Sequence, residues 1–95
     1  MPSTYKLVVD NGSLSGVTGH HTIQCHVEET LDDGTIVQGI PEVFGIEAIA
    51  LQRAHDGDPV KWRTWVAGVM ADRHKRRQLA HAEIMQWSGK KFDIG

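Results

Sequence analysis

The sequence predicts an α+β fold, in which a three-stranded antiparallel β-meander is followed by a short helix and a long C-terminal α-helix. Apolar and polar residues alternate through most of the first 40 positions, as in strands with one buried face. Helix start signals then occur together at Asp58-Pro59, and no further proline precedes Ser88. The chain has 95 residues, 40% of them hydrophobic and 23% charged, which fits a single domain over residues 1–95.

The meander is expected over residues 4–40. Asn11-Gly12 is a strong turn signal and is expected to end the first strand, and the Gly- and Ser-rich stretch 12–19 is expected to be a hairpin loop. Leu31-Asp32-Asp33-Gly34 predicts a second hairpin turn. The three strands expected around these turns are Thr4–Val9, His21–Glu28 and Thr35–Ile40.

Pro41 is expected to close the sheet, and two readings remain open for residues 42–55. Val43, Ile46 and Ile49 fall at helical spacing, which predicts a short helix. Val43–Ile46 can instead begin as a short strand that leads into a helix. Gly45 weakens the helical reading by about 1 kcal/mol relative to alanine.

The long helix is expected over residues 59–88, with Asp58 as its N-cap and Gly89 as its C-terminal cap. Such a helix is about 45 Å long, whereas a six-residue strand spans about 20 Å. We therefore expect the helix to extend beyond its sheet. Gly68 lowers the stability expected for the helix. It is expected to be either a hinge or a position where another backbone segment approaches closely. Residues 90–95 form a tail in which Phe92 and Ile94 alternate with polar residues, as in a short edge strand.

One face of this helix is expected to be apolar at its start and at its end. At 100° per residue, a single stripe contains Trp62, Val66, Val69, Ala80, Ile84 and Trp87. In the middle of the helix the same stripe carries Arg73 and Arg76. Asp72 is the one local partner for these cations, so most of the basic segment 73–77 is expected to lack a partner within the helix.

Charge is divided along the chain. Residues 1–60 contain two basic residues and nine acids, a net charge of −7, and residues 61–95 contain eight basic residues and three acids, a net charge of +5. Such asymmetry bears on partners and self-association. The basic segment is either solvated, docked on a protein, or bound to a polyanion. The candidate partner-binding residues are Arg73, Lys75, Arg76, Arg77, Lys61 and Arg63.

The sequence predicts no catalytic, cofactor or metal site. His20, His21, Cys25 and His26 are the one cluster of metal-ligand types, but on a strand His21 and Cys25 face one side while His20 and His26 face the other. Cys25 and His26 therefore point apart, which disfavours a nucleophile and its base. No nucleotide-binding or hydrolase motif is present, so we expect no enzyme.

Nucleic-acid binding is the alternative function. A basic helical run shares its element with Trp62, Trp65 and Trp87, but burial against the sheet is expected to account for these aromatic side chains. Asp56 and Asp58 would repel phosphates, and the formal net charge of −2 is unlike that of most DNA-binding domains.

Part of the sequence resembles small uncharacterised proteins of tailed bacteriophages and prophages. The resemblance rests on Gly45–Gln52, on Gly57-Asp58, and on a tryptophan-containing helix that ends at Trp87–Gly89, and it covers about the last 50 residues. It implies a viral or prophage origin, as a virion component, an assembly factor or an inhibitor of a host factor. No residue role can be transferred from it.

These observations together predict a non-enzymatic protein that acts by contact with itself or with another protein. The simplest form of this hypothesis is a homo-oligomer in which the acidic sheet end of one copy meets the basic helix of the next. A single cysteine, no long apolar run and no secretory leader predict the cytoplasm of the host cell, or the virion, as its location, with no membrane partner.

Overall fold

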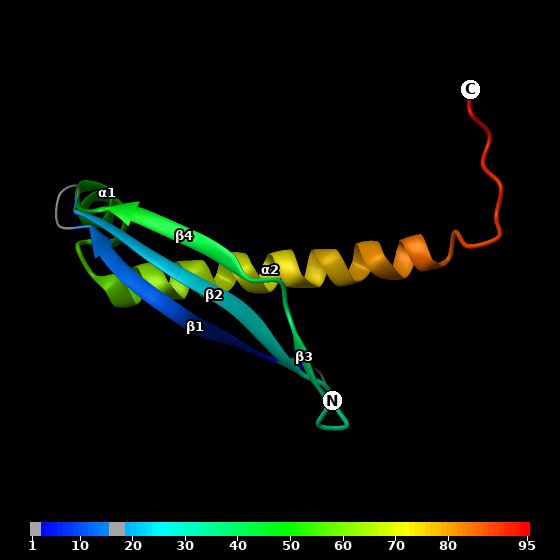
Figure 1. Cartoon of the computed structure of the whole chain (residues 1–95), viewed down its shortest axis with the longest axis horizontal. Coiled ribbons are helices and arrows are strands. Elements are labelled where there is room, and N and C mark those ends of the chain that lie inside the picture. The colour runs from blue at the N-terminus through cyan, green and yellow to red at the C-terminus, as the bar shows by residue number, and fades with distance from the viewer. Residues whose placement is uncertain (1–2, 16–18) are drawn as a thin grey trace.

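A computed structural model describes residues 3–15 and 19–95 and confirms the α+β class. An antiparallel sheet is packed on one side by a long helix, with a short helix at one end (Figure 1). The elements are β1 (Thr4–Ser15), β2 (His20–Thr30), β3 (Ile36–Gln38), β4 (Glu42–Glu47), α1 (Ala48–His55) and α2 (Pro59–Met85).

Only residues 36–38 of the predicted third strand form a strand, and a fourth strand follows at residues 42–47. β2 is the central strand and pairs with β1 on one side. On its other side β3 pairs with residues 28–30, and β4 pairs with residues 20–25. Pro41 was expected to close the sheet. It lies instead between β3 and β4, and the sheet continues beyond it. Of the two readings for residues 42–55, the strand followed by a helix is the one observed.

The two hairpins differ in how well local sequence predicts them. Asn11-Gly12 does not end β1, because the strand passes through a bulge between Val9 and Asn11 and continues to Ser15. Residues 16–18 of the predicted loop lie outside the described residues. The second turn is confirmed: Gly34 has φ 88°, and its N–H donates to the Leu31 carbonyl at 2.9 Å.

The long helix begins as predicted and ends three residues early. The Asp58 carboxylate accepts a 2.9 Å hydrogen bond from the Val60 N–H, and Pro59 occupies the first turn. The helix ends at Met85 rather than Ser88, and Gly89 adopts φ 77° in the following turn. The tail 90–95 forms no strand, contrary to expectation. Gly68 lies in open space on the helix, so no neighbouring described backbone explains it.

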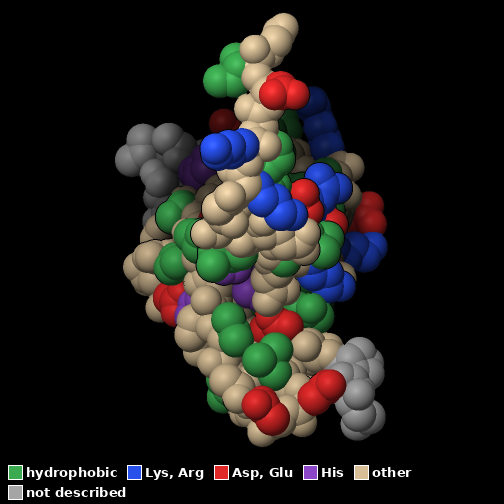
Figure 2. Space-filling view, turned by 90° about the vertical axis from the view of Figure 1, so that its right-hand side faces the viewer, with side chains coloured by type: hydrophobic (Ala, Val, Ile, Leu, Met, Phe, Trp, Pro, Cys, Tyr) green, Lys and Arg blue, Asp and Glu red, His purple; other side chains and the backbone are tan. Residues whose placement is uncertain are grey.

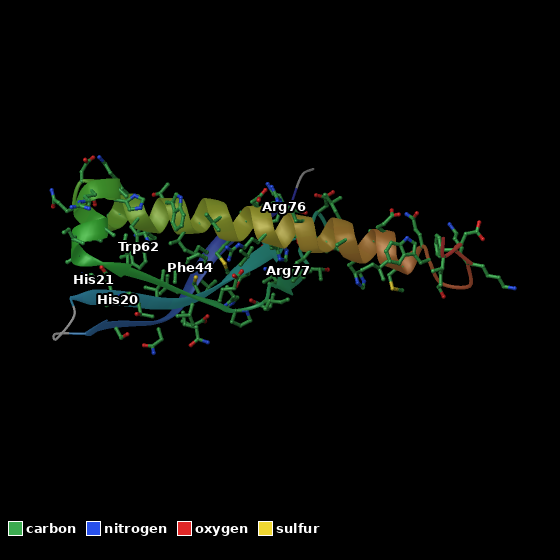
Figure 3. The ribbon with its side chains drawn as sticks, turned by 90° about the horizontal axis from the view of Figure 1, so that it is seen from above. His20, His21, Phe44, Trp62, Arg76 and Arg77 are labelled. Atoms are coloured by element: carbon green, nitrogen blue, oxygen red, sulfur yellow. The ribbon has the colours of Figure 1, made fainter. Side chains whose placement is uncertain are left out.

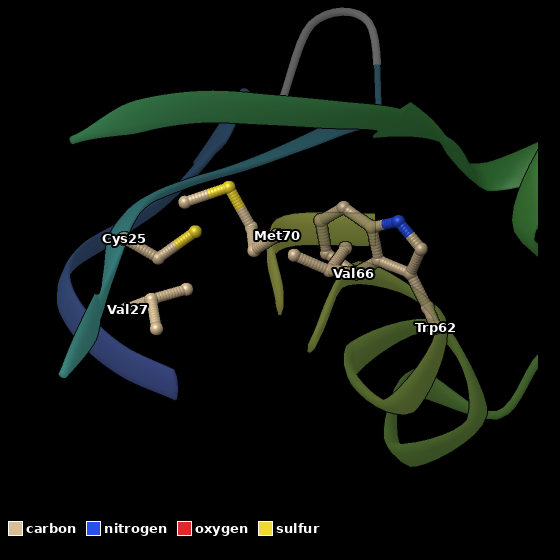
Figure 4. Packing of buried hydrophobic residues seen from close by; sticks show 5 residues of the cluster. All are labelled: Cys25, Val27, Trp62, Val66 and Met70. Atoms are coloured by element: carbon tan, nitrogen blue, oxygen red, sulfur yellow. The ribbon is translucent and has the colours of Figure 1, made fainter. Parts of the chain in front are cut away.

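The core lies between β2 and the first half of α2 (Figure 4). Its buried hydrophobic residues are Cys25, Val27, Trp62, Val66 and Met70, and the alternation predicted for the second strand is confirmed. The predicted helix stripe is wrong beyond its start, because Ala80, Ile84 and Trp87 are exposed. The buried positions instead follow one another at intervals of four residues, from Trp62 to His74, so the contact line moves about 40° round the helix at each step.

The helix extends beyond the sheet, as predicted, but for a different reason. β2 has 11 residues and spans about 37 Å, and α2 has 27 residues and spans about 40 Å, so length alone does not explain the overhang. The strands run diagonally to the helix, and the β2–β3 end of the sheet diverges from it (Figure 1). The radius of gyration is 17.7 Å, well above the roughly 12 Å typical of a compact chain of this length.

Candidate functional site

Two arginines of the basic segment 73–77 face a carboxylate on the sheet. Arg73 Nη1 lies 2.5 Å from Glu42 Oε1, and Arg77 Nη1 lies 3.5 Å from Glu42 Oε2. Arg73 also lies over the Phe44 ring, with its guanidinium carbon 5.6 Å from the ring centroid. Glu42 lies on β4, outside the helix, so the expectation that most of these cations lack a partner within the helix stands. Arg73 and Arg77 instead have an acidic partner elsewhere in the chain.

The other two cations of this segment, Lys75 and Arg76, have different partners. Arg76 Nε lies 2.9 Å from Asp72 Oδ2, the local pair that the helical spacing predicts. In Figure 3 the Arg76 label lies on the side of α2 away from the sheet, and Arg77 lies on the sheet side. Lys75 Nζ lies 4.8 Å from the centroid of the Tyr5 ring. Arg76 remains highly exposed, so its charge still faces solvent.

Lys61 and Arg63 do not belong to the same surface. They lie in the first turns of α2, about 15 Å or more along the helix axis from the basic segment. Lys61 Nζ contacts Asp56 Oδ2 at 2.6 Å, which raises the pKa of the lysine and lowers that of the aspartate. Arg63 borders an open apolar groove. The six predicted partner-binding residues thus divide into two groups at different positions along the helix.

A buried polar cluster beneath the basic segment was not predicted. Glu29 of β2 and His74 of α2 are 3% and 5% exposed, and a 2.9 Å hydrogen bond joins Glu29 Oε1 to His74 Nε2. Gln78 Nε2 donates to the same carboxylate oxygen. The hydrogen bond from His74, followed by that from Gln78, lowers the pKa of Glu29 against the opposing effect of burial. This cluster lies where the apolar core ends and the sheet begins to diverge from the helix.

Tyr5 completes the cluster on the β1 side. Its ring meets the His74 ring edge to face, with centroids 6.0 Å apart. Burial, and then the neighbouring Glu29 charge, raise the pKa of the tyrosine. A buried, hydrogen-bonded histidine and carboxylate resemble catalytic groups in type, and here both side chains are almost completely shielded from solvent. The arrangement is suited to holding α2 on the sheet.

The histidine and cysteine residues near the start of β2 are divided between the two faces of the sheet, as predicted. Cys25 is fully buried under α2, and burial, with smaller effects of Glu42 and Asp10, raises the pKa of its thiol, which disfavours a reactive thiolate. His26, on the other face, lies 2.8 Å from Asp10 Oδ2, and this hydrogen bond raises the pKa of the histidine. Within the described residues no group of three metal-ligating side chains is close enough to hold an ion.

The end of α2 and the tail that follows it carry apolar side chains on a fully exposed segment. Leu79 is 72% exposed, Ile84 52%, Phe92 63% and Ile94 103%. Trp87 and Phe92 contact each other edge to face, with ring centroids 6.0 Å apart. Figure 2 views the molecule from this end and shows Lys and Arg side chains gathered in its upper part, with acidic side chains at the lower tip. An exposed apolar surface therefore lies beside a basic one.

No protein-family model matches the chain, and the searches of curated proteins and of solved structures find no significant match. The structure defines an α+β protein whose long helix covers a small antiparallel sheet and then extends past it. None of the helices in the described part of the chain combines the length and the apolar character needed to cross a bilayer.

Proposed function

We propose that this protein acts by protein–protein contact, without catalysis, and that it self-associates through the projecting end of α2. The observation that carries the proposal is segment 79–95, every residue of which is exposed, including its large apolar side chains. Clusters of exposed apolar side chains bordered by polar residues commonly mark interaction sites. We name the segment 79–95 the projecting end.

Charge favours a head-to-tail arrangement over a symmetric one. Within the projecting end Lys90 and Lys91 balance Glu83 and Asp93, so the positive charge lies in the adjoining basic segment 73–77, where Lys75 and Arg76 are exposed. Two copies that met about a two-fold axis at this segment would bring its positive charges together. The β2–β3 hairpin carries Glu28, Asp32 and Asp33, and it supplies the opposite charge. The basic segment of one copy, where it adjoins the projecting end, is therefore complementary in charge to the acidic sheet end of another copy.

The resemblance to small proteins of tailed bacteriophages and prophages agrees with such a role. Virion components, assembly factors and inhibitors of host factors commonly act by surface contact. Within the proposal, the protein is a component of this kind, located in the host cytoplasm or in the virion. The resemblance and the exposed surface support this assignment independently of each other.

Binding of nucleic acid along residues 61–77 has less support. Glu42 neutralises part of the charge of Arg73 and Arg77, and Asp56 does the same for Lys61. One observation favours nucleic-acid binding. Trp65 and Trp87 were expected to be buried against the sheet, but both side chains are about half exposed. Their exposure is at least as well explained by a protein partner, since tryptophan is enriched at protein interfaces.

Sedimentation velocity over a range of concentrations, at about 0.05 M and about 0.5 M NaCl, tests the proposal. We expect concentration-dependent association that weakens at high salt. The variant Lys75→Glu/Arg76→Glu should sediment as a smaller species than the wild type at low salt. Arg53→Glu on α1 is the matched control, since it changes one charge far from the projecting end. A wild-type monomer under every condition contradicts self-association, and retention on DNA or RNA at low salt would favour the alternative.

A further inference from the structure

A second apolar surface lies at the opposite end of α2. An open groove of about 320 Å³ separates the first turn of this helix from strands β1 and β2. Its lining residues are Val9, Ile23, Pro59, Val60, Trp62 and Arg63. Gly12 is the β1 residue paired with Ile23, so β1 places no side chain over Ile23 at this point. The groove is thus a gap in the cover of the core, and its size suits one or two side chains.

We propose that this groove binds the C-terminal segment Phe92–Ile94 of a second copy of the chain. The inference rests on the self-association proposed above. It places the tail of the projecting end at the α1 end of the second copy, away from the β2–β3 hairpin, so this apolar contact is separate from the charge contact.

The chemistry of the segment matches that of the groove. In an extended chain Phe92 and Ile94 project to the same side, and Asp93 projects to the other. The two apolar side chains can enter the groove while the Asp93 carboxylate stays at its rim. Arg63 stands at that rim, and within the described residues it forms no ion pair. The acidic residue of the tail therefore meets an unpaired cation.

The tail of the same chain cannot reach this groove. Val60 and Met85 are separated by about 37 Å along the helix axis. Phe92 is seven residues beyond Met85, and seven residues span at most about 25 Å when fully extended. The occupant must therefore come from another molecule. Because the tail and the groove lie at opposite ends of α2, successive contacts form a head-to-tail series that either closes into a ring or grows as a filament.

Cysteine cross-linking between two differently labelled copies tests the contact directly. Val60→Cys protein mixed with Ile94→Cys protein under mild oxidation should give a disulfide-linked heterodimer faster than either protein alone. Both positions are exposed, and the native Cys25 is fully buried. Thr64→Cys is the matched control for Val60→Cys, since it is exposed on the same part of α2 but belongs neither to the groove lining nor to the projecting end. Equal rates for positions 60 and 64 would overturn the inference.

A charge exchange separates this inference from the proposed function. Arg63→Glu and Asp93→Lys should each weaken association about two- to five-fold, as exposed ion pairs do, and the double variant should restore it. Phe92→Ala should weaken it about ten-fold or more, because burial of a Phe side chain is lost. If the wild type associates but all these variants associate equally well, the tail–groove contact is wrong and self-association stands. If the wild type never associates, both fail.

Discussion

The two halves of α2 have opposite environments. The first half buries Trp62, Val66 and Met70 against the sheet, whereas Ile84 and Leu79 in the second half are largely exposed. Both halves carry apolar side chains at helical spacing. The difference arises because the strands run diagonally to the helix and diverge from it beyond His74. Helical periodicity therefore identifies which side chains can be buried, and the direction of the sheet decides which of them are.

The largest effect is expected from truncating equivalent side chains in the two halves. Met70→Ala should destabilise the protein by about 2–5 kcal/mol, because Met70 is fully buried and its loss leaves a cavity. Ile84→Ala should change the free energy of unfolding by less than about 0.5 kcal/mol. Urea denaturation at low protein concentration measures both. A comparable loss of unfolding free energy for the two variants would show that Ile84 is covered in solution. The contrast between the two halves of α2 would then be wrong.

A smaller effect is expected at the boundary between the two halves. Glu29→Gln removes the carboxylate that binds His74 and Gln78, and it should cost about 1–3 kcal/mol at neutral pH. The folded state lowers the pKa of Glu29, so its stabilising contribution is present above the unfolded value of 4.5 and is lost as the pH falls through the folded value. The variant should therefore lose less stability than the wild type on acidification.

Urea denaturation of both proteins from about pH 7 to about pH 2 measures this difference. Asp33→Asn is the control. A hydrogen bond from Thr35 also lowers the pKa of Asp33, but Asp33 is fully exposed in the hairpin turn. The control should retain most of the acid sensitivity of the wild type. Identical acid profiles for the wild type and Glu29→Gln would show that Glu29 does not join the helix to the sheet.

The smallest effect is expected on the outer face of the covered half. Gly68→Ala should stabilise the protein by roughly 0.5–1 kcal/mol, because glycine is a poor helix former and the added methyl group meets open space. Thermal unfolding, followed by circular dichroism, measures the gain. A loss of stability would mean that another molecule packs closely against Gly68, which would place an interface on the covered half as well as on the projecting end.

Several parts of the fold that depend on short-range pattern were predicted from the sequence, although the turn expected at Asn11-Gly12 and the strand expected in the tail were not observed. The alternation around Cys25, the turn at Gly34 and the N-cap at Asp58 each depend on a few neighbouring residues. The break at Pro41 was missed because proline commonly ends a strand, and nothing local shows that β4 rejoins β2. The exposure of Ile84 was missed because it depends on the direction in which the strands cross the helix.

The candidate site was predicted in part. Segment 73–77 was identified from its charge, and the pair between Asp72 and Arg76 follows from helical spacing. The contact of Arg73 with Glu42 joins residues 31 positions apart, and that of His74 with Glu29 joins residues 45 positions apart. Such contacts depend on how the helix is aligned on the sheet, which periodicity does not determine. A histidine within a basic run gives no local signal that it is buried.

The buried pair of Glu29 and His74 also determines the register of the helix on the sheet. Apolar side chains that recur every four residues fit the sheet nearly as well after a slip of one helical turn, about 5.4 Å. Such a slip would place Met70 where His74 now meets Glu29, and the buried carboxylate would lose one of the two side-chain hydrogen bonds that it accepts, which is costly. The polar pair therefore selects one alignment among several that the apolar core alone would accept. It thereby sets how far the projecting end extends beyond the sheet.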